Sequence, residues 1–270
     1  MIYAMSDIHG CLTALEENLA LIDLSGTNRL VLLGDYIGYG HESCAVLERI
    51  RELQREYGAE KVIVLKGNHE AMFLEWIAEY ERPLSAEEAE LAYDSWLKTD
   101  GEYRYNTYRT FLPVEVFEKY LKFAESADFA AGNTEAVRLL MKEKGDLIKW
   151  LRGLPLFYET EDQIFVHAGV DEEAGEYWSY GTGEEVLLWK FPATCGKFLK
   201  TIVAGHVGTS GLAHDRAFHD VFYDGESHYF IDGSVYNHGK LLILGYDEAS
   251  GKYYQIEKSG RREVRAEREE

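Results

Sequence analysis

The residues in this sequence that could do chemistry occur in five short segments that share one residue pattern. In each segment, a short apolar stretch is followed at once by a side chain that can bind a metal ion, with a glycine close by. The first segment contains Asp7 and His9, which are separated by one residue and followed by Gly10. The other four segments are Gly34-Asp35, Gly67-Asn68-His69-Glu70, His167-Ala168-Gly169 and Gly205-His206.

The donor atoms of these segments are carboxylate oxygens, imidazole nitrogens and a carboxamide oxygen. This mixture suits borderline to hard divalent ions such as manganese, iron or zinc. Six protein ligands are too many for one catalytic ion that must keep a coordination position open. They suit two ions that share a bridging carboxylate, and such a pair can generate hydroxide from water and hold a phosphoryl group for in-line attack. The residues therefore predict a dinuclear site for phosphoryl chemistry.

Each of these residues also has an ordinary structural explanation. A single histidine after a strand is more often a buried or surface residue than a ligand, and Asp and Asn are common in turns. Glu70, which follows His69, is expected to orient the local backbone. The set as a whole favours the metal site, because five strand ends in one chain all combine a ligand with a small neighbour.

Short strands and helices alternate around the first three segments. Strands are expected at residues 2–5, 29–33 and 61–65, and helices at about 13–22 and 43–57. In the first helix, Thr13 and Glu16 have the spacing of a capping box. This alternation predicts an α/β fold with parallel strands, whose carboxyl ends are the usual place for ligands. Later strands are expected at 163–166, 201–204, 228–232, 240–246 and 252–256, the last three being more antiparallel.

Residues 71–154 differ from the rest of the chain because no strand pattern occurs in them. We interpret them as a helical insertion that caps the site, within a single domain covering residues 1–257. Residues 258–270 mix Arg and Glu with almost nothing apolar and are expected to form a charged C-terminal tail.

Composition excludes several classes of protein. The 270 residues are 46% apolar, which supports a large core, and the formal net charge is -20. A surface that is so acidic repels nucleic acids and anionic membranes, so neither is expected as a partner. No apolar run is long enough for a membrane span. Cys11, Cys44 and Cys195 have no paired spacing, which favours free thiols in a cytoplasmic protein.

The five segments, in this order, resemble the motif series of calcineurin-like metallophosphoesterases. The Gly67-Asn68-His69-Glu70 signature is similar to that of the phosphoprotein phosphatase branch. That branch contains serine/threonine protein phosphatases and bacterial symmetrical dinucleoside tetraphosphatases, and the stretches Leu151–Pro155, Phe165–Val170 and Ile231–Gly233 resemble the bacterial members. The resemblance implies a β-sandwich flanked by helices on both sides.

The resemblance also implies a role for each ligand. Asp35 would bridge two divalent ions. Manganese is the metal expected in vitro, and iron or zinc are the alternatives. The first ion would be held by Asp7, His9, Asp35 and His206, and the second by Asp35, Asn68 and His167. His69 would be the general acid that protonates the leaving group, since an imidazole can donate a proton near neutral pH.

The second motif departs from the family, which usually reads Gly-Asp-x-x-Asp-Arg-Gly. Here the aspartate that orients the acid histidine is replaced by Gly38, and the phosphate-binding arginine is replaced by Tyr39. Tyr39 can still donate one hydrogen bond to a phosphate. A second arginine of relatives follows a tryptophan, and here Lys190 follows Trp189, so Lys190 is expected to contact the phosphate as a point charge. Restoring an aspartate by Gly38→Asp is expected to raise turnover.

Three functions follow from these observations. The first is a phosphatase for phosphomonoesters of the serine/threonine protein phosphatase type, which acts by attack of a metal-bound hydroxide on phosphorus. The second is a dinucleoside polyphosphate hydrolase. The third is a metal-binding scaffold with impaired catalysis, which the replacements at Gly38 and Tyr39 suggest. In the first two cases the partner is a phosphorylated substrate, and the sequence leaves the oligomeric state open.

Overall fold

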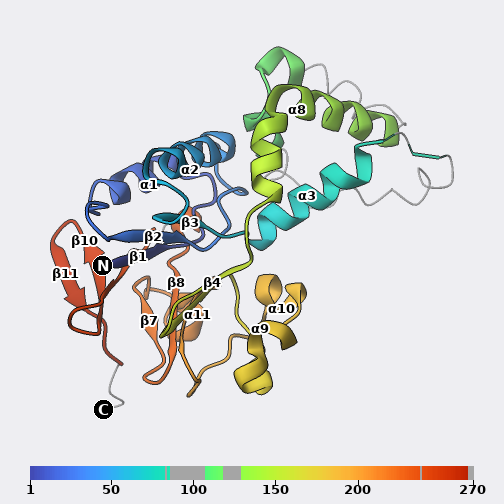
Figure 1. The fold of residues 1–270 in the computed structure, drawn as a ribbon. Coiled ribbons are helices and arrows are strands. Elements are labelled where there is room, and N and C mark those ends of the chain that lie inside the picture. Colours follow the sequence, from blue (N-terminus) through green and yellow to red (C-terminus); the bar gives the residue numbers. More distant parts are fainter. Residues whose placement is uncertain (83, 86–106, 118–128, 238, 267–270) are drawn as a thin grey trace.

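The strands of this protein form two sheets that pack face to face. The computed structural model describes residues 1–82, 84–85, 107–117, 129–237 and 239–266 (Figure 1). The first sheet has the order β11-β10-β9-β1-β2-β3 and contains β1 (Ile2–Met5), β2 (Arg29–Leu32), β3 (Val62–Val64), β9 (Leu244–Asp247), β10 (Lys252–Glu257) and β11 (Gly260–Glu263). The second has the order β4-β5-β6-β8-β7 and contains β4 (Phe157–Glu159), β5 (Gln163–Val166), β6 (Thr201–Gly208), β7 (Phe222–Tyr223) and β8 (His228–Asp232).

The side chains of each central strand alternate between two cores, because successive residues of a strand point to opposite faces. In β1, Ile2 and Ala4 pack in the core between the two sheets. Tyr3 and Met5 pack on the opposite face, against helices. Both faces of these strands are therefore buried, as in other sheets with parallel strands.

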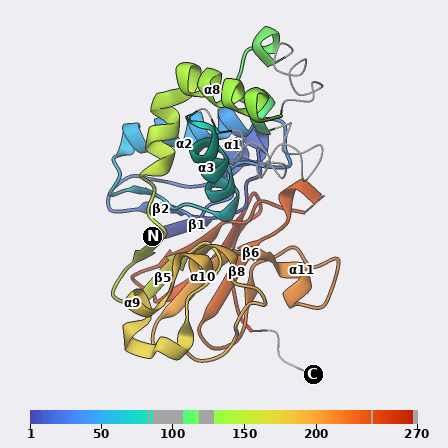
Figure 2. The ribbon, with the colours of Figure 1, turned by 90° about the vertical axis from the view of Figure 1, so that its right-hand side faces the viewer.

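Helices cover the outer face of each sheet, so the molecule has four layers (Figure 2). On the first sheet, α1 (Leu12–Leu19) begins one residue before Thr13, and its N-terminus has no side-chain cap, so the predicted capping box is absent. Next to it, α2 (Ser43–Tyr57) ends at Gly58, which has a φ of 91°. The second sheet is covered by η2 (Glu172–Tyr177), α9 (Trp178–Gly181), α10 (Glu184–Trp189) and α11 (Thr209–Leu212), and η3 (Val235–Asn237) follows β8.

The described part of the predicted insertion is helical and extends to one side of the sandwich (Figure 1). It contains most of α3 (Asn68–Tyr80) and α8 (Phe129–Arg152), which is bent at Lys144. The two helices pack through buried side chains, and the Trp76 indole donates a hydrogen bond of 3.1 Å to Asn133 Oδ1. Among the described residues, no helix is both long and apolar enough to cross a membrane.

Two expectations about the C-terminal half are corrected by the structure. The strand at 228–232, expected to be more antiparallel, pairs in parallel with β6 on one side and antiparallel with β7 on the other, so that expectation holds only in part. Residues 260–263, expected in the charged tail, form β11 and pair with β10. This edge strand is stable because the side chain that follows it, Val264, is buried in the core between the sheets, while its charged residues face solvent.

Candidate metal centre

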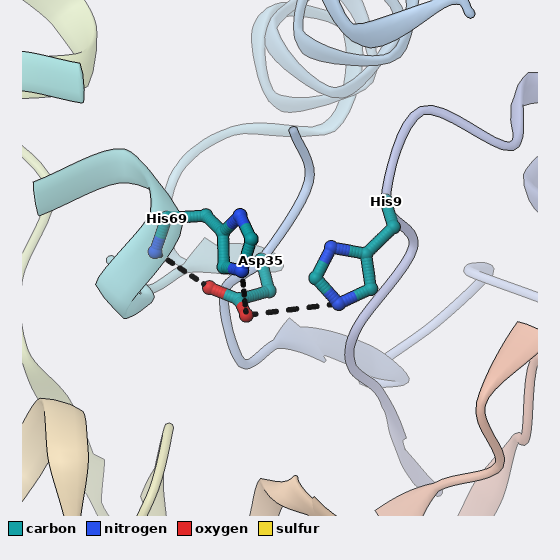
Figure 3. Close-up of side chains that lie close together, drawn as sticks. All are labelled: His9, Asp35 and His69. Carbon is teal, nitrogen blue, oxygen red and sulfur yellow. Dashed lines mark hydrogen bonds and ion pairs between the residues drawn. The ribbon is translucent and has the colours of Figure 1, made fainter. Parts of the chain in front are cut away.

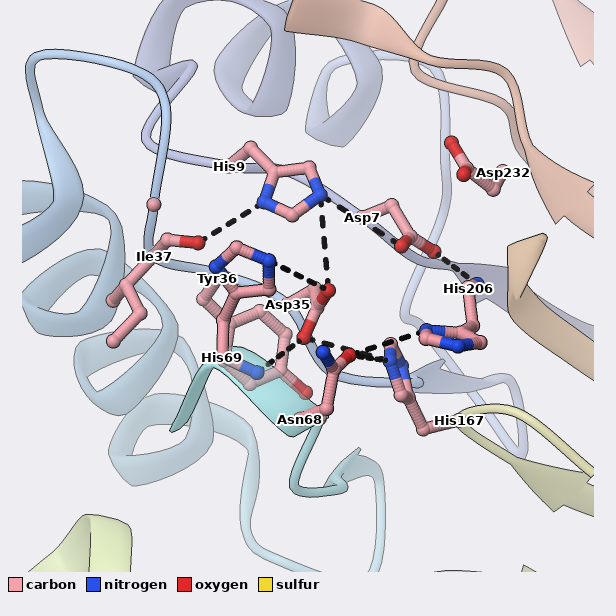
Figure 4. A network of polar contacts seen from close by, with 12 residues as sticks. Asp7, His9, Asp35, Tyr36, Ile37, Asn68, His69, His167, His206 and Asp232 are labelled. Carbon is pink, nitrogen blue, oxygen red and sulfur yellow. Dashed lines mark hydrogen bonds and ion pairs between the residues drawn. The ribbon is translucent and has the colours of Figure 1, made fainter. Parts of the chain in front are cut away.

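The carboxyl ends of the parallel strands of both sheets meet at one place, and the candidate ligands gather there (Figure 4). Asp7 and His9 follow β1, and Asp35 follows β2. Asn68 and His69 form the first turn of α3, which comes after β3. His167 follows β5 and His206 lies within β6. The structure therefore brings together all six predicted metal ligands and the predicted acid, from both sheets.

Asp35 lies at the centre of this cluster. Its Oδ2 atom is 3.7 Å from His9 Nε2, and its Oδ1 atom is 3.5 Å from His167 Nε2. The two oxygens thus face histidines from different sheets. His9 Nε2 is also 3.8 Å from Asp7 Oδ1. One carboxylate placed between two sets of donors is the geometry of a ligand that bridges two cations.

The donor atoms form two groups, each compact enough for one ion, and both groups include Asp35. The first group contains His9 and His69, and the second contains His167 and His206. His206 thus lies in the same donor group as His167, whereas the resemblance assigned it to the first ion with Asp7 and His9, so its assignment to either ion stays a prediction. His206 Nδ1 lies 3.2 Å from Asn68 Oδ1, while only the backbone N–H of His206 contacts Asp7, at 3.0 Å from Oδ2.

Several of these residues have a backbone conformation that L-amino acids rarely adopt. The φ angles are 56° for Asp7, 47° for His9, 56° for Asp35 and 61° for His206. Such a conformation costs on the order of 1–3 kcal/mol per residue and persists only where the surroundings enforce it. A close approach of the backbone is part of this enforcement, because a Cβ atom on Gly205 would lie 2.2 Å from Asp7 Oδ2.

Glu70 holds the loop that carries Asp35. Its carboxylate accepts hydrogen bonds from the backbone N–H groups of Asp35, Tyr36, Ile37 and Gly67, at 2.8, 2.8, 3.1 and 3.0 Å. The side chain is fully buried. Burial and the negative charge of Asp35 raise the pKa of Glu70 to about 8, so a cation beside Asp35 would favour the ionised form. The predicted role of Glu70 in orienting the backbone is confirmed.

The protonation states of the cluster fit divalent cations. Burial lowers the pKa of His9 and of His167 to about 4, so both imidazoles are neutral and offer a lone pair at pH 7. Burial acts to raise the pKa of Asp35, but His167, His69 and His9 outweigh it and lower this pKa to about 2. Metal ligation requires this combination of neutral imidazoles and ionised carboxylates.

Negative charge also accumulates in the cluster. Burial, followed by the charges of Asp232 and Asp35, raises the pKa of Asp7 well above its usual range. Burial raises the pKa of Asp232 to about 6. Bound cations would stabilise the ionised form of these carboxylates. The donor set therefore fits two divalent metal ions.

His69 lies beside Asp35 at the start of α3 (Figure 3). Its backbone N–H donates a hydrogen bond of 3.0 Å to Asp35 Oδ1, and its Nε2 atom is 3.8 Å from Asp35 Oδ2. Its ring packs against the rings of His9 and Tyr39, with centroid distances of 4.8 and 5.3 Å. These contacts orient the imidazole in a site that has no aspartate at position 38.

Gly38 is packed directly against His69. Its φ angle is 96°, and a Cβ atom added to it would lie 2.4 Å from His69 Nδ1. This packing argues against the expectation that Gly38→Asp raises turnover, because an aspartate would displace the His69 ring and strain the backbone, and the expectation stays a prediction.

The ligands form one wall of a cavity of about 250 Å³. The other described residues that line the cavity, which we call the opposite wall, are Tyr39, Asp232, Ser234, Tyr236 and Asn237. Tyr39 thus reaches the site, as predicted, but Lys190 does not line it. The Lys190 ammonium donates a hydrogen bond to the carbonyl of Val170 and forms an ion pair with Glu172.

No described residue between 71 and 154 lines the cavity, and the helix expected from Ser85 lies mostly outside the described residues.

Sequence reasoning missed four residues of the opposite wall, and one of them had a recognisable signal. Asp232 ends the strand β8 and is followed by Gly233, so it repeats the pattern of the five segments. Ser234, Tyr236 and Asn237 follow it in a tight loop and show no pattern of their own. A larger cavity of about 370 Å³ lies between α1 and β10, and it contains none of the candidate ligands.

A sandwich of two mixed sheets with helices outside, and a cluster of carboxylates and imidazoles at the strand ends, define a metal-dependent phosphoester hydrolase. The chain belongs to the calcineurin-like phosphoesterase family, whose sequence pattern matches residues 1–244. The resemblance found in the motifs and the predicted fold class are therefore confirmed.

Two curated relatives are symmetrical bis(5'-nucleosyl)-tetraphosphatases. That of Wigglesworthia glossinidia brevipalpis is 37% identical over 73 residues, which cover 27% of this chain and 25% of the relative. That of Janthinobacterium sp. (strain Marseille) is 24% identical over 169 residues, which cover 62% of this chain and 43% of the relative. The matched segments thus span less than half of either relative.

A solved structure shares the fold over almost the whole chain. It is a cold-active protein-tyrosine phosphatase of a psychrophilic Shewanella species, with a TM-score of 0.58 and 16% sequence identity. The match covers 98% of this chain and 80% of that structure. At this identity, the likeness concerns the fold alone.

Proposed function

We propose that this protein is a dimetal phosphatase that hydrolyses phosphomonoesters, in the manner of serine/threonine protein phosphatases. The observation that supports it best is the placement of Asp35 between two groups of imidazoles that come from different sheets. Manganese is the metal that we expect to support activity in vitro. Two divalent ions held there would activate a water molecule and neutralise the charge of the phosphoryl oxygens.

The protein's own residues would contribute position and a proton. Asp35 would fix the spacing between the two metal positions, because Glu70 holds its loop by four backbone hydrogen bonds. His69 lies at the wall of the cavity and would donate a proton to the leaving oxygen, a role for which a positioned imidazole is worth about 10²–10⁴ in rate. The phenol of Tyr39 would hydrogen-bond the phosphoryl group in place of an arginine.

A second candidate is hydrolysis of dinucleoside polyphosphates. It is supported by the names of the two curated relatives, which are both symmetrical tetraphosphatases. The third alternative, a metal-binding scaffold with impaired catalysis, rests on the absence of the family's aspartate and arginine at Gly38 and Tyr39. The two walls of the cavity are compatible with all three, so substrate preference must be measured.

The test is to measure metal content and hydrolysis on the same purified protein. Metals are quantified after dialysis against Mn²⁺, and turnover is followed on 4-nitrophenyl phosphate, a phosphoserine peptide and diadenosine tetraphosphate. We expect about two ions per chain and turnover of the phosphomonoesters. Preferred cleavage of diadenosine tetraphosphate would support the second candidate. Two ions without turnover would support the scaffold, and a chain that binds no metal would overturn the proposal.

A further inference from the structure

The opposite wall of the cavity contains two aromatic rings, Tyr39 and Tyr236. Tyr39 and Tyr236 stack on each other with a centroid distance of 5.2 Å and an interplanar angle of 27°. Tyr39 also meets the ring of His9 edge-on at 4.8 Å. Four rings, two from tyrosines and two from His9 and His69, therefore form a continuous aromatic surface that begins at the metal ligands.

Both tyrosines are held by short loops with specific backbone bonds. Tyr39 has a φ angle of 50° and lies between Gly38 and Gly40, whose backbone N–H donates to the carbonyl of His9 at 2.9 Å. On the other side, the carboxylate of Asp232 accepts a hydrogen bond of 2.7 Å from the backbone N–H of Ser234 and so fixes the turn into η3. The rings are thus preorganised, which lowers the entropic cost of binding against them.

The exposure of Tyr236 also points to a ligand. Its side chain lines the cavity and remains 41% exposed, so the ring is accessible to a bound group. Among the described residues that line the cavity, none carries a positive charge apart from any protonated histidine. Apart from Asp232, the described residues beyond the candidate ligands therefore offer a substrate ring stacking and neutral hydrogen bonds, the latter from Ser234 and Asn237.

We propose that the Tyr39–Tyr236 ring pair binds the leaving group of aryl phosphomonoesters, and that the enzyme prefers these to alkyl phosphomonoesters. This inference rests on the proposed function. The position of the rings selects the class of substrate, because Tyr39 is in contact with His9, a candidate metal ligand. An aryl group bonded directly to the phosphoryl oxygen would therefore lie nearest to these rings, whereas a ribose separates a nucleobase from the nearest phosphate.

The reaction is an ordinary hydrolysis. A water oxygen forms a bond to phosphorus, and the bond between phosphorus and the aryl oxygen breaks. The proton that His69 donates leaves with the aryl oxygen, so the products are a phenol and inorganic phosphate. His69 regains a proton from the attacking water by way of solvent, and no oxidant or further reactant is needed.

The test compares O-phosphotyrosine with O-phosphoserine in the wild type, Tyr236→Leu and Tyr236→Phe. The ratio of the two kcat/KM values is compared between variants, so the intrinsic reactivity of the esters cancels. We expect Tyr236→Leu to lower this ratio about three- to tenfold, because an aromatic pair is lost, and Tyr236→Phe to keep it within about twofold. Tyr57→Leu is the matched control, since Tyr57 is similarly exposed (36%) and lies on α2. An unchanged ratio in Tyr236→Leu would overturn the inference.

A binding measurement separates this inference from the proposed function. Phenylphosphonate and methylphosphonate are titrated calorimetrically into the Mn²⁺-loaded protein, which needs no turnover. Tighter binding of phenylphosphonate, lost in Tyr236→Leu, supports the aromatic subsite even if no ester is hydrolysed, in which case only the proposed function fails. Equal affinities in the wild type overturn the subsite, whatever the hydrolytic activity is.

Discussion

The two walls of the cavity are built in different ways. The wall of metal ligands consists of charged and imidazole groups that strand ends supply, several of them with φ angles near 50–60°. The opposite wall consists of two tyrosines and short polar side chains from two loops. The candidate ligands have the residue types that the resemblance implies, whereas two departures from the expected motifs, Gly38 and Tyr39, lie in the loop that leads to the opposite wall.

This difference shows which requirements of the site are strict. A ligand must present one donor atom at a fixed place, so its residue type, its backbone conformation and its small neighbours are all constrained. A residue that contacts the leaving group needs only to complement that group, so it can vary with the substrate. The following substitutions test this distinction, from the largest expected effect to the smallest.

Asp35→Asn should have the largest effect, because it removes the charge of the carboxylate shared by both metal groups. We expect less than one bound ion per chain and a loss of turnover of at least about 10³-fold, since metal ions provide several kcal/mol of stabilisation to the transition state. Metal content and kcat are measured together. The control is Asp162→Asn, at an exposed position outside the site. Two tightly bound ions in Asp35→Asn would refute the bridging role.

His69→Ala tests whether His69 is the general acid or a metal ligand, because its position is compatible with both roles. As the acid, its loss should lower kcat about 10²–10³-fold while both ions remain bound. The loss should be larger for an alkyl phosphate than for 4-nitrophenyl phosphate, because nitrophenolate leaves without a proton. If one ion were lost instead, His69 would belong to the ligand wall.

Glu70→Gln tests the support of the ligand wall. The amide would direct an NH₂ group towards backbone N–H groups that now donate to a carboxylate, and each donor left without an acceptor costs about 1–3 kcal/mol. We expect the free energy of unfolding in urea to fall by about 2–3 kcal/mol, with weaker metal binding. Glu75→Gln, at an exposed position of the same helix, is the control and should change little. If Glu70→Gln and the wild type were equally stable in urea, the Glu70 carboxylate would not be needed to hold the loop.

Gly38→Ala should have the smallest effect on activity. The added methyl group would lie 2.4 Å from His69 Nδ1 and so displace the ring, and we expect a loss in kcat of about tenfold with unchanged metal content, besides a loss of stability from the φ angle of 96°. Gly211→Ala is the control, because a Cβ atom there has no neighbour within 4 Å. If Gly38→Ala retained full activity, the position of the His69 ring would not limit the reaction.

The sequence was sufficient to predict the ligand wall because each ligand follows a strand whose apolar residues are visible in the sequence. Asp7, Asp35 and His167 were found in this way, and they meet although up to 160 residues separate them. The donor group that His206 joins could not be predicted, since it depends on the register of β6 against β8. That register shifts between Ala204 and Gly208.

Most residues of the opposite wall could not be predicted from the sequence, for a physical reason. Tyr236 reaches the cavity through a turn after β8, and turns are specified by a few local bonds rather than by a repeated pattern. Lys190 was wrongly expected to line the site, because the sequence does not show which residue a charged side chain near a motif will pair with. The ion pair with Glu172 depends on how η2 packs against the segment after α10. Likewise, the edge strand β11 was missed because its charged residues conceal the pairing with β10.

The order in which the chain supplies its ligands has a consequence for biosynthesis. Asp7, His9, Asp35 and His69 have all been synthesised once residue 69 is added, whereas the second group needs His167 and His206. A growing chain therefore contains every donor of one group long before it contains those of the other. The second group is completed only when the second sheet docks against the first, so occupancy of the second position reports that the two halves of the molecule have joined.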